Sequence, residues 1–337
     1  YGHDKIYYSL IYRRHNLNKG EQILTSFILK KLLNGLLLVF TVSVLVFSMM
    51  HLMPGDPVDL IVDRKVSQER KDIIRHEYGY DRPLTVQYVD WILKIISKGD
   101  FGTSLRVKQK VADMMDARIP LSLKLCGWML FFEIVIAVPL GLLCAYKKDT
   151  FLDRAIINVT LFLSAVPSFW LYVLLILLFS VTLKWLPISG YEKAVNWVLP
   201  IGGGVLGSLA GTIRLTKTEV LDVFREKYVL TAYAKGLPHK TVMVKHVMRN
   251  ALILITVLVF MSIPWLISGA VITERIFSIP GMGSLLVNSI ITQDYAVVQG
   301  CILIIAVLTV VFNTLSDVVV GMLDPRIRIT MNGGAGA

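Results

Sequence analysis

Charged side chains are scarce in this sequence, and their scarcity excludes most soluble folds. Only 18% of the 337 residues are Asp, Glu, Lys or Arg, whereas 55% are hydrophobic. A soluble domain of this composition could not cover its apolar surface with polar groups, so a lipid bilayer is the expected solvent. The net charge of +11 comes without an arginine-rich arm or a zinc spacing. It therefore favours membrane lipid over nucleic acid as the partner.

Cysteine and enzyme motifs are also nearly absent. The three cysteines, Cys126, Cys144 and Cys301, lie in apolar runs and form no CxxC pair. We expect them to be buried as small apolar side chains. The sequence contains no HExxH, GxSxG or GxxxxGK[ST] pattern. We therefore expect no metal site, no bound cofactor and no ATPase activity on this chain itself.

Long apolar runs dominate what is present. A membrane-spanning helix needs about 20 mostly apolar residues. Six segments meet this requirement, namely 32–53, 121–145, 155–183, 197–213, 251–273 and 296–320. They predict an all-α polytopic membrane protein with six transmembrane helices.

The distribution of Lys and Arg predicts the orientation of these helices. The segments 1–31, 146–154, 214–249 and 321–337 carry 19 of the 35 Lys and Arg residues, whereas the short segments 184–196 and 274–294 carry 3. Because cytosolic loops are enriched in Lys and Arg, both termini and the loop 214–249 are predicted to be cytosolic. Residues 54–120 then form an extracytosolic subdomain between the first two helices, and residues 121–320 form the transmembrane core.

Polar and small residues inside the predicted spans mark candidate sites. Glu133 lies near the middle of the second span, where a carboxylate is costly and a functional role is the first hypothesis. The alternative is a protonated or paired carboxyl that faces Lys124 or a partner subunit. Gly203, Gly207 and Gly211 share one face of the fourth span. Their spacing allows close helix packing, either within the bundle or between two subunits.

Proline residues interrupt several of the predicted spans. Pro139, Pro167 and Pro264 fall in the second, third and fifth spans. A proline frees a backbone carbonyl that neighbouring helices, side chains or water must satisfy, so such spans sit against protein or a cavity. A translocation pathway and simple packing kinks both account for them.

A short amphipathic stretch lies within the loop 214–249. Residues 226–237 place apolar side chains at helical spacing, and Gly236 followed by Pro238 predicts a firm stop. Such a helix suits either the lipid interface or a groove on a protein partner. Composition alone leaves these two uses open.

Several motifs, in order along the chain, resemble those of one transporter family. They are HLMPGDP, YGYDRPLTVQYVDWI, GDFGTS, VPSFW, LPISG, YVLTAYAKGL with HVMRNAL, ERIFSIPGMGSLL with DYAVVQG, and DPRIR. Together they run from about Phe27 to Arg328 and are similar to the ABC-importer permeases of the dipeptide, oligopeptide and nickel group. The pair YVLTAYAKGL and HVMRNAL resembles the EAA loop of these permeases.

The resemblance implies a type I ABC-importer permease fold with a coupling helix that contacts an ATPase. The family's coupling residues carry over to Thr231, Ala232, Ala234, Lys235, Gly236 and Leu237. The implied partners are a second, homologous permease subunit in a heterodimer, two cytosolic subunits that bind ATP and Mg²⁺, and an extracytosolic substrate-binding protein. The implied location is a bacterial or archaeal inner membrane.

The resemblance also implies a class of cargo. A short peptide is the expected cargo, and nickel or a metal chelate is the alternative within the family. A secondary transporter or channel that works without an ATPase is the alternative from another class.

Overall fold

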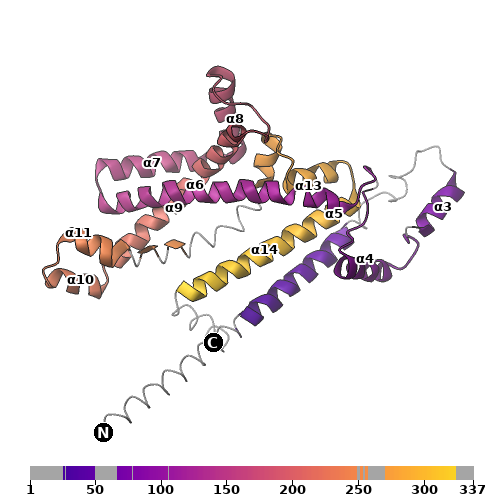
Figure 1. Cartoon of the computed structure of the whole chain (residues 1–337), viewed down its shortest axis with the longest axis horizontal. Helices are drawn as coiled ribbons and strands as arrows, with labels where there is room; N and C mark the ends of the chain where they lie inside the picture. The colour runs from indigo at the N-terminus through magenta and orange to yellow at the C-terminus, as the bar shows by residue number, and fades with distance from the viewer. Residues whose placement is uncertain are drawn as a thin grey trace, which may run out of the picture.

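Helices make up the regular structure of the described residues (Figure 1). The computed structural model describes residues 26, 28–49, 67–77, 79–104, 106–248, 251–252, 255–256 and 270–323. Its longer helices are an N-terminal helix (Ile28–Met49), α3 (Gln68–Glu77), α4 (Leu84–Lys98), α6 (Ile119–Tyr146), α7 (Phe151–Ala165), α9 (Val198–Phe224), α13 (Met282–Ile291) and α14 (Tyr295–Leu323). Shorter ones are α5 (Val111–Asp116), α8 (Ser168–Leu175), α10 (Lys227–Ala234) and α11 (His239–Thr241), with helical turns at Ile176–Thr182, Ala194–Trp197 and Val242–Met248. The predicted all-α class is confirmed.

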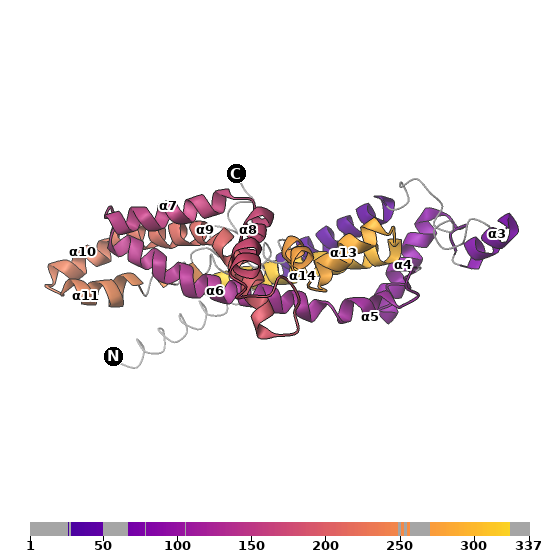
Figure 2. The same cartoon turned by 90° about the horizontal axis from the view of Figure 1, so that it is seen from above.

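The two ends of the molecule carry different segments. Helices α10 and α11 lie at one end, and α3 and α4 lie at the other (Figures 1 and 2). This separation is compatible with the predicted placement of the loop 214–249 and of residues 54–120 on opposite sides of the membrane. The assignment of each side to cytosol or exterior stays a prediction.

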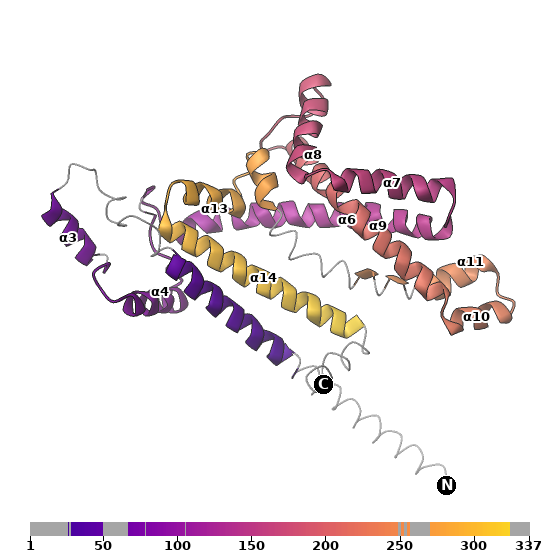
Figure 3. The same cartoon turned by 180° about the vertical axis from the view of Figure 1, so that it is seen from behind.

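The N-terminal helix and α14 lie side by side (Figures 1 and 3). The Lys31 ammonium lies 2.8 Å from the Asp317 carboxylate. A Cβ built on Gly35 would lie 2.4 Å from Val310 Cγ1, so the two helices touch at this glycine. The first and last described spans therefore pair through an ion pair and a close backbone approach.

Helices α6 and α9 form the centre of the packed core. Leu125 of α6 and Ile213 of α9 are completely buried in one apolar cluster. A Cβ built on Gly141 would lie 2.5 Å from Thr216 Cβ and 2.9 Å from the Ile213 carbonyl oxygen. The two helices therefore cross in contact at Gly141, where only a hydrogen atom fits.

Replacing Gly141 with alanine should lower the free energy of unfolding by about 1–3 kcal/mol, because the methyl group overlaps α9. Thermal unfolding of the detergent-purified chain measures this loss. Gly202→Ala is the matched control, since no atom of the described residues lies within 4 Å of a Cβ built there. Both changes gain helix propensity, so an equal effect on stability in the two variants would contradict the close crossing.

The predicted third span, 155–183, with Pro167 as its helix breaker, is sharply bent. The chain forms α7 and then the helical segment Ser168–Thr182, whose axes differ by 102°. The break lies at Val166 and Pro167, both in extended backbone conformation. Proline has no N–H to continue the helical ladder and disfavours helical geometry in the residue before it. The predicted breaker is therefore a sharp corner.

The helix that contains the predicted fourth span, 197–213, extends beyond it. Helix α9 continues to Phe224 and so takes eleven residues from the predicted loop 214–249. Polar residues do not end the helix here because they have partners: Thr216 packs against Gly141, and Lys217 pairs with Asp153. The connecting segment begins only at Arg225.

Among the described residues, four helices are long and apolar enough to span a membrane, namely Ile28–Met49, Val111–Tyr146, Ala194–Phe224 and Tyr295–Val319. The bent pair α7 and Ser168–Thr182 raises the count to five. Most of the predicted fifth span, 251–273, lies outside the described residues, as do 1–25 and 324–337. The total of six spans therefore stays a prediction.

The segment before α6 is attached to the helical bundle at two places. Tyr88 of α4 shares a hydrogen bond of 2.8 Å with Ser43 of the N-terminal helix. Further along, Ser104 donates to the Asp294 carboxylate, and Arg106 donates to the Thr292 carbonyl oxygen at 3.0 Å. The segment therefore packs on the N-terminal helix and on the corner between α13 and α14.

Candidate functional site

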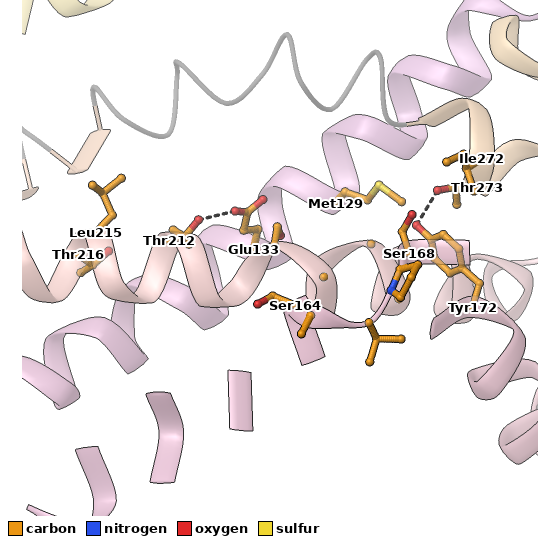
Figure 4. A pocket seen from close by; sticks show the side chains of 18 of the residues that line it. Met129, Glu133, Ser164, Ser168, Tyr172, Thr212, Leu215, Thr216, Ile272 and Thr273 are labelled. Atoms are coloured by element: carbon orange, nitrogen blue, oxygen red, sulfur yellow. Dashed lines mark hydrogen bonds between the residues drawn. The ribbon is translucent and has the colours of Figure 1, made fainter. Parts of the chain in front are cut away.

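A cavity of about 700 Å³ lies beside the crossing of α6 and α9 (Figure 4). Its described lining comes from α6, the corner between α7 and α8, α9, and residues near the ends of the predicted fifth span. Hydroxyl groups line it on several sides, from Ser164, Ser168, Tyr172, Ser208, Thr212, Thr216 and Thr273. Met129, Leu215, Ile255 and Ile272 add apolar surface. The cavity is therefore amphipathic and lies between predicted spans.

Glu133 of α6 projects into this cavity (Figure 4). The side chain is 5% exposed, and its Oε1 accepts a hydrogen bond of 2.6 Å from the Thr212 hydroxyl. The suggested partner Lys124 lies elsewhere, with its ammonium 4.7 Å from the centre of the Trp197 ring. Because a carboxylate at the centre of a spanning helix costs about 2.5–3.5 kcal/mol on insertion scales, Glu133 is the most unusual residue of this lining.

The sharp corner at Pro167 brings further polar groups to the cavity. It turns the chain so that Ser164 and Ser168, on either side of the break, both line the space. At the far end, the Tyr172 hydroxyl shares a hydrogen bond of 2.6 Å with Thr273 (Figure 4). The proline is therefore associated with a cavity and is more than a local kink.

The three glycines of the predicted row, Gly203, Gly207 and Gly211, lie in two different surroundings. A Cβ on Gly203 would lie 2.5 Å from the Tyr172 ring, so this glycine packs within the bundle. Among the described residues, no atom lies within 4 Å of a Cβ built on Gly207 or Gly211, and both glycines line the cavity. The row as a whole is thus not one helix-packing seam within the described residues, and its use between subunits stays a prediction.

The predicted amphipathic helix of residues 226–237 is present as α10. Its inner face packs Val229 and Ala232 against Val242 and Val247. Gly236 ends the segment with a φ of 75°, a left-handed conformation that favours glycine, and Pro238 follows. The stop predicted from Gly236 and Pro238 is therefore confirmed.

The six predicted coupling residues divide between two faces. Ala232 is buried and Leu237 is half-buried, whereas Thr231, Ala234, Lys235 and Gly236 are exposed. The outer face also carries Leu230, which is 61% exposed. Leu230 is one of the apolar positions that predict this helix, but it is not among the six predicted coupling residues.

An aromatic cluster around His239 ties α10 to the ends of α6 and α9. The His239 ring stacks on Phe224 and Tyr233 and lies beside Tyr146. A hydrogen bond of 2.6 Å joins the Tyr233 hydroxyl to His239 Nδ1. The cluster therefore links α10 and α11 to the ends of two helices that line the cavity.

Comparison with known families matches nearly the whole chain. Residues 137–329 match the model of the binding-protein-dependent transport system inner membrane component. Residues 24–126 match the N-terminal model of the same membrane component. The chain belongs to this permease family. The resemblance to ABC-importer permeases is thereby confirmed, and the protein is a multi-pass component of the inner membrane.

Named relatives match this permease over nearly their whole length. A protein of Brucella melitensis named as a peptide transport system permease is 34% identical over 314 residues, covering 91% of this chain and 99% of the relative. The oligopeptide transport system permease protein AppB of Bacillus subtilis is 33% identical, with 90% and 100% covered. The glutathione transport system permease protein GsiC of Escherichia coli is 32% identical, with 90% and 99% covered.

A solved structure shows that the permease fold is shared beyond these relatives. A chain of the methionine ABC transporter MetNI, in inward-facing conformations, aligns with a TM-score of 0.52 at 16% identity. The alignment covers 63% of this permease and 96% of that chain. At this identity the likeness concerns the fold alone, and it supports the type I importer architecture.

Proposed function

We propose that this permease forms, with a second homologous permease subunit, the pathway by which an ATP-driven importer carries short peptides into the cell. The observation that carries the proposal is the continuity of α9. One half of this helix lines the cavity, and its C-terminal end leads directly into α10. The names of the relatives AppB and GsiC support a peptide-like cargo. An extracytosolic binding protein would deliver that cargo to the outer end of the pathway.

The length of α9 allows a mechanical connection between its cavity-lining residues and α10. Helix α9 has 27 residues and is therefore about 40 Å long. Thr212 lies twelve residues before Phe224, which corresponds to about 18 Å along the axis. A rigid helix of this kind moves its cavity-lining residues when its end is displaced. Alternating access then follows from tilting α9 against α6.

Helix α10 supplies the contact at which that displacement begins. Its outer face, with Leu230, Thr231 and Ala234, suits a groove on a cytosolic ATPase subunit that binds ATP and Mg²⁺. The buried inner face fixes α10 to the segment Val242–Met248. Because α10 is held on one side and exposed on the other, it can transmit a push. The proposed contact requires the loop 214–249 to lie in the cytosol, as the distribution of Lys and Arg predicts.

Reconstitution into proteoliposomes tests the proposed function. Vesicles that contain both permeases, both ATPase subunits and external binding protein should accumulate labelled trialanine only when ATP is enclosed with the ATPase subunits. Vesicles with this chain alone should show no uptake. ATP-independent uptake by the chain alone would contradict the importer and favour a secondary transporter or channel.

A further inference from the structure

Glu133 lies at the midpoint of α6 and lines a cavity whose described lining has no other ionisable side chain than that of a tyrosine. Helix α6 has 28 residues from Ile119 to Tyr146, and Glu133 is the fifteenth. Of the described residues that line the cavity, Glu133 is the one carboxyl, and none is Lys, Arg or His. The Glu133 carboxyl is thus placed at the middle of α6, beside a space of about 700 Å³.

The described residues give the Glu133 carboxyl a hydrogen-bond donor but no positively charged partner. Thr212 donates to Oε1 at 2.6 Å. Among the described residues, no ion pair reaches Glu133, and Lys124 is engaged by the Trp197 ring instead. A buried carboxylate without a cation is strongly disfavoured, so a cation that enters the cavity would be held there.

The chemistry of the lining selects an ammonium group over a metal ion. An ammonium has three N–H donors and no acceptor, and the Glu133 carboxylate with the hydroxyls of Ser164 and Ser208 offers acceptors for them. Structural zinc takes four ligands and calcium six to eight, whereas the described residues contain no cluster of three metal-ligating side chains. One carboxylate and several hydroxyls match a monovalent organic cation.

We propose that Glu133 binds the α-ammonium group of a peptide in transit, with Thr212 holding the carboxylate toward the cavity. The inference rests on the proposed function, since it names the contact that cargo makes inside the pathway. The cavity volume lies within the range of about 300–1,000 Å³ that is usual for small-molecule sites. Met129, Leu215 and Ile272 leave apolar surface for the side chains of the peptide.

Equilibrium dialysis of the complete transporter in detergent, without the binding protein, tests this proposal. The probes are labelled trialanine and N-acetyl-trialanine, which differ in the ammonium charge. The wild type should bind trialanine at least about tenfold more tightly than the acetylated peptide. Glu133→Gln keeps the shape of the side chain and should bind both peptides equally. Glu219→Gln, a carboxyl on α9 outside the cavity lining, should keep the preference.

Carbodiimide labelling of carboxyl groups provides a second measurement on the wild-type chain. Trialanine should slow the modification of Glu133, read by mass spectrometry, and N-acetyl-trialanine should not, while Glu219 serves as the internal reference. Equal affinities in the wild type, absence of binding at about 10 mM, or a preference retained in Glu133→Gln would overturn the proposal. ATP-driven uptake of trialanine by the wild-type vesicles separates this failure from a failure of the proposed function.

Discussion

Replacing Gly236 with valine should reduce ATP-driven uptake to background while the chain still inserts into the membrane. Gly236 has a φ of 75°, and in the described part of the chain no atom lies within 4 Å of a Cβ built on it. The effect therefore comes from the backbone and not from crowding. A left-handed conformation costs an L-residue about 1–2 kcal/mol, and it is least favourable for a β-branched side chain. The substituted chain will leave this conformation.

That change removes the end of α10. The amides of Lys235, Gly236 and Leu237 donate to the carbonyl oxygens of Thr231, Tyr233 and Ala232. When Gly236 leaves the left-handed region, the bond from the Leu237 amide to Ala232 is lost and the path to Pro238 changes. The outer face of α10 is then presented to the ATPase in a different orientation. ATP hydrolysis should continue in proteoliposomes without driving uptake.

Two further variants identify the cause of the loss. Gly236→Asn should retain much of the uptake, because asparagine tolerates the left-handed region. Gly127→Val makes the same chemical change in open space on α6, without a left-handed backbone, and should transport. Normal uptake by Gly236→Val would show that α10 is not the coupling helix. Equal loss in the valine and asparagine variants would point to the added side chain instead of the backbone.

Local signals explain why α10 was predictable from sequence. Its apolar spacing, its glycine and its proline all lie within about a dozen residues and act on the same backbone segment. The apolar spans were predictable for a similar reason, since length and composition suffice to identify them. Local signals could not show which residue forms a hydrogen bond or ion pair with a polar side chain inside a span.

The partner of Glu133 illustrates this limit. Lys124 was a reasonable candidate by charge, but nine residues separate it from Glu133 on one helix. Residues three and four apart share a helix face, so this spacing gave no contact. The hydrogen-bond partner, Thr212, is 79 residues away and is brought close only by the crossing of α6 and α9. Similarly, Pro167 predicted a break, but not the corner of 102° that builds one wall of the cavity.

Removal of the Asp153 carboxylate should have the largest effect on stability. The Lys217 ammonium lies 2.7 and 2.8 Å from the two oxygens of Asp153, and the Asp153 side chain is 3% exposed. The Asp149 amide also donates to this carboxylate at 2.9 Å. Removing one partner of a buried pair typically costs about 3–5 kcal/mol, because the other charge is left desolvated. Since Lys217 is 21% exposed, we expect a loss near the lower limit for Asp153→Ala.

Thermal and denaturant unfolding in detergent measure this loss. The control is a second ion pair, which lies at the C-terminal end of α9. Asp222 and Arg225 are 3.9 Å apart, and their side chains are 61% and 76% exposed. Exposed pairs of this kind contribute about 0–1 kcal/mol, so Asp222→Ala should be nearly neutral. Equal stabilities of the two alanine variants would contradict a structural role for the buried pair.

The double variant Asp153→Ala with Lys217→Met separates stability from coupling. Methionine removes the stranded ammonium, so much of the lost stability should return. The pair, however, joins the start of α7 to the half of α9 that leads into α10. Without it, α9 can move without carrying α7 and the corner at Pro167. Uptake by the double variant should therefore remain low although the protein is stable, whereas full recovery of uptake would mean that the pair stabilises the bundle without transmitting its movement.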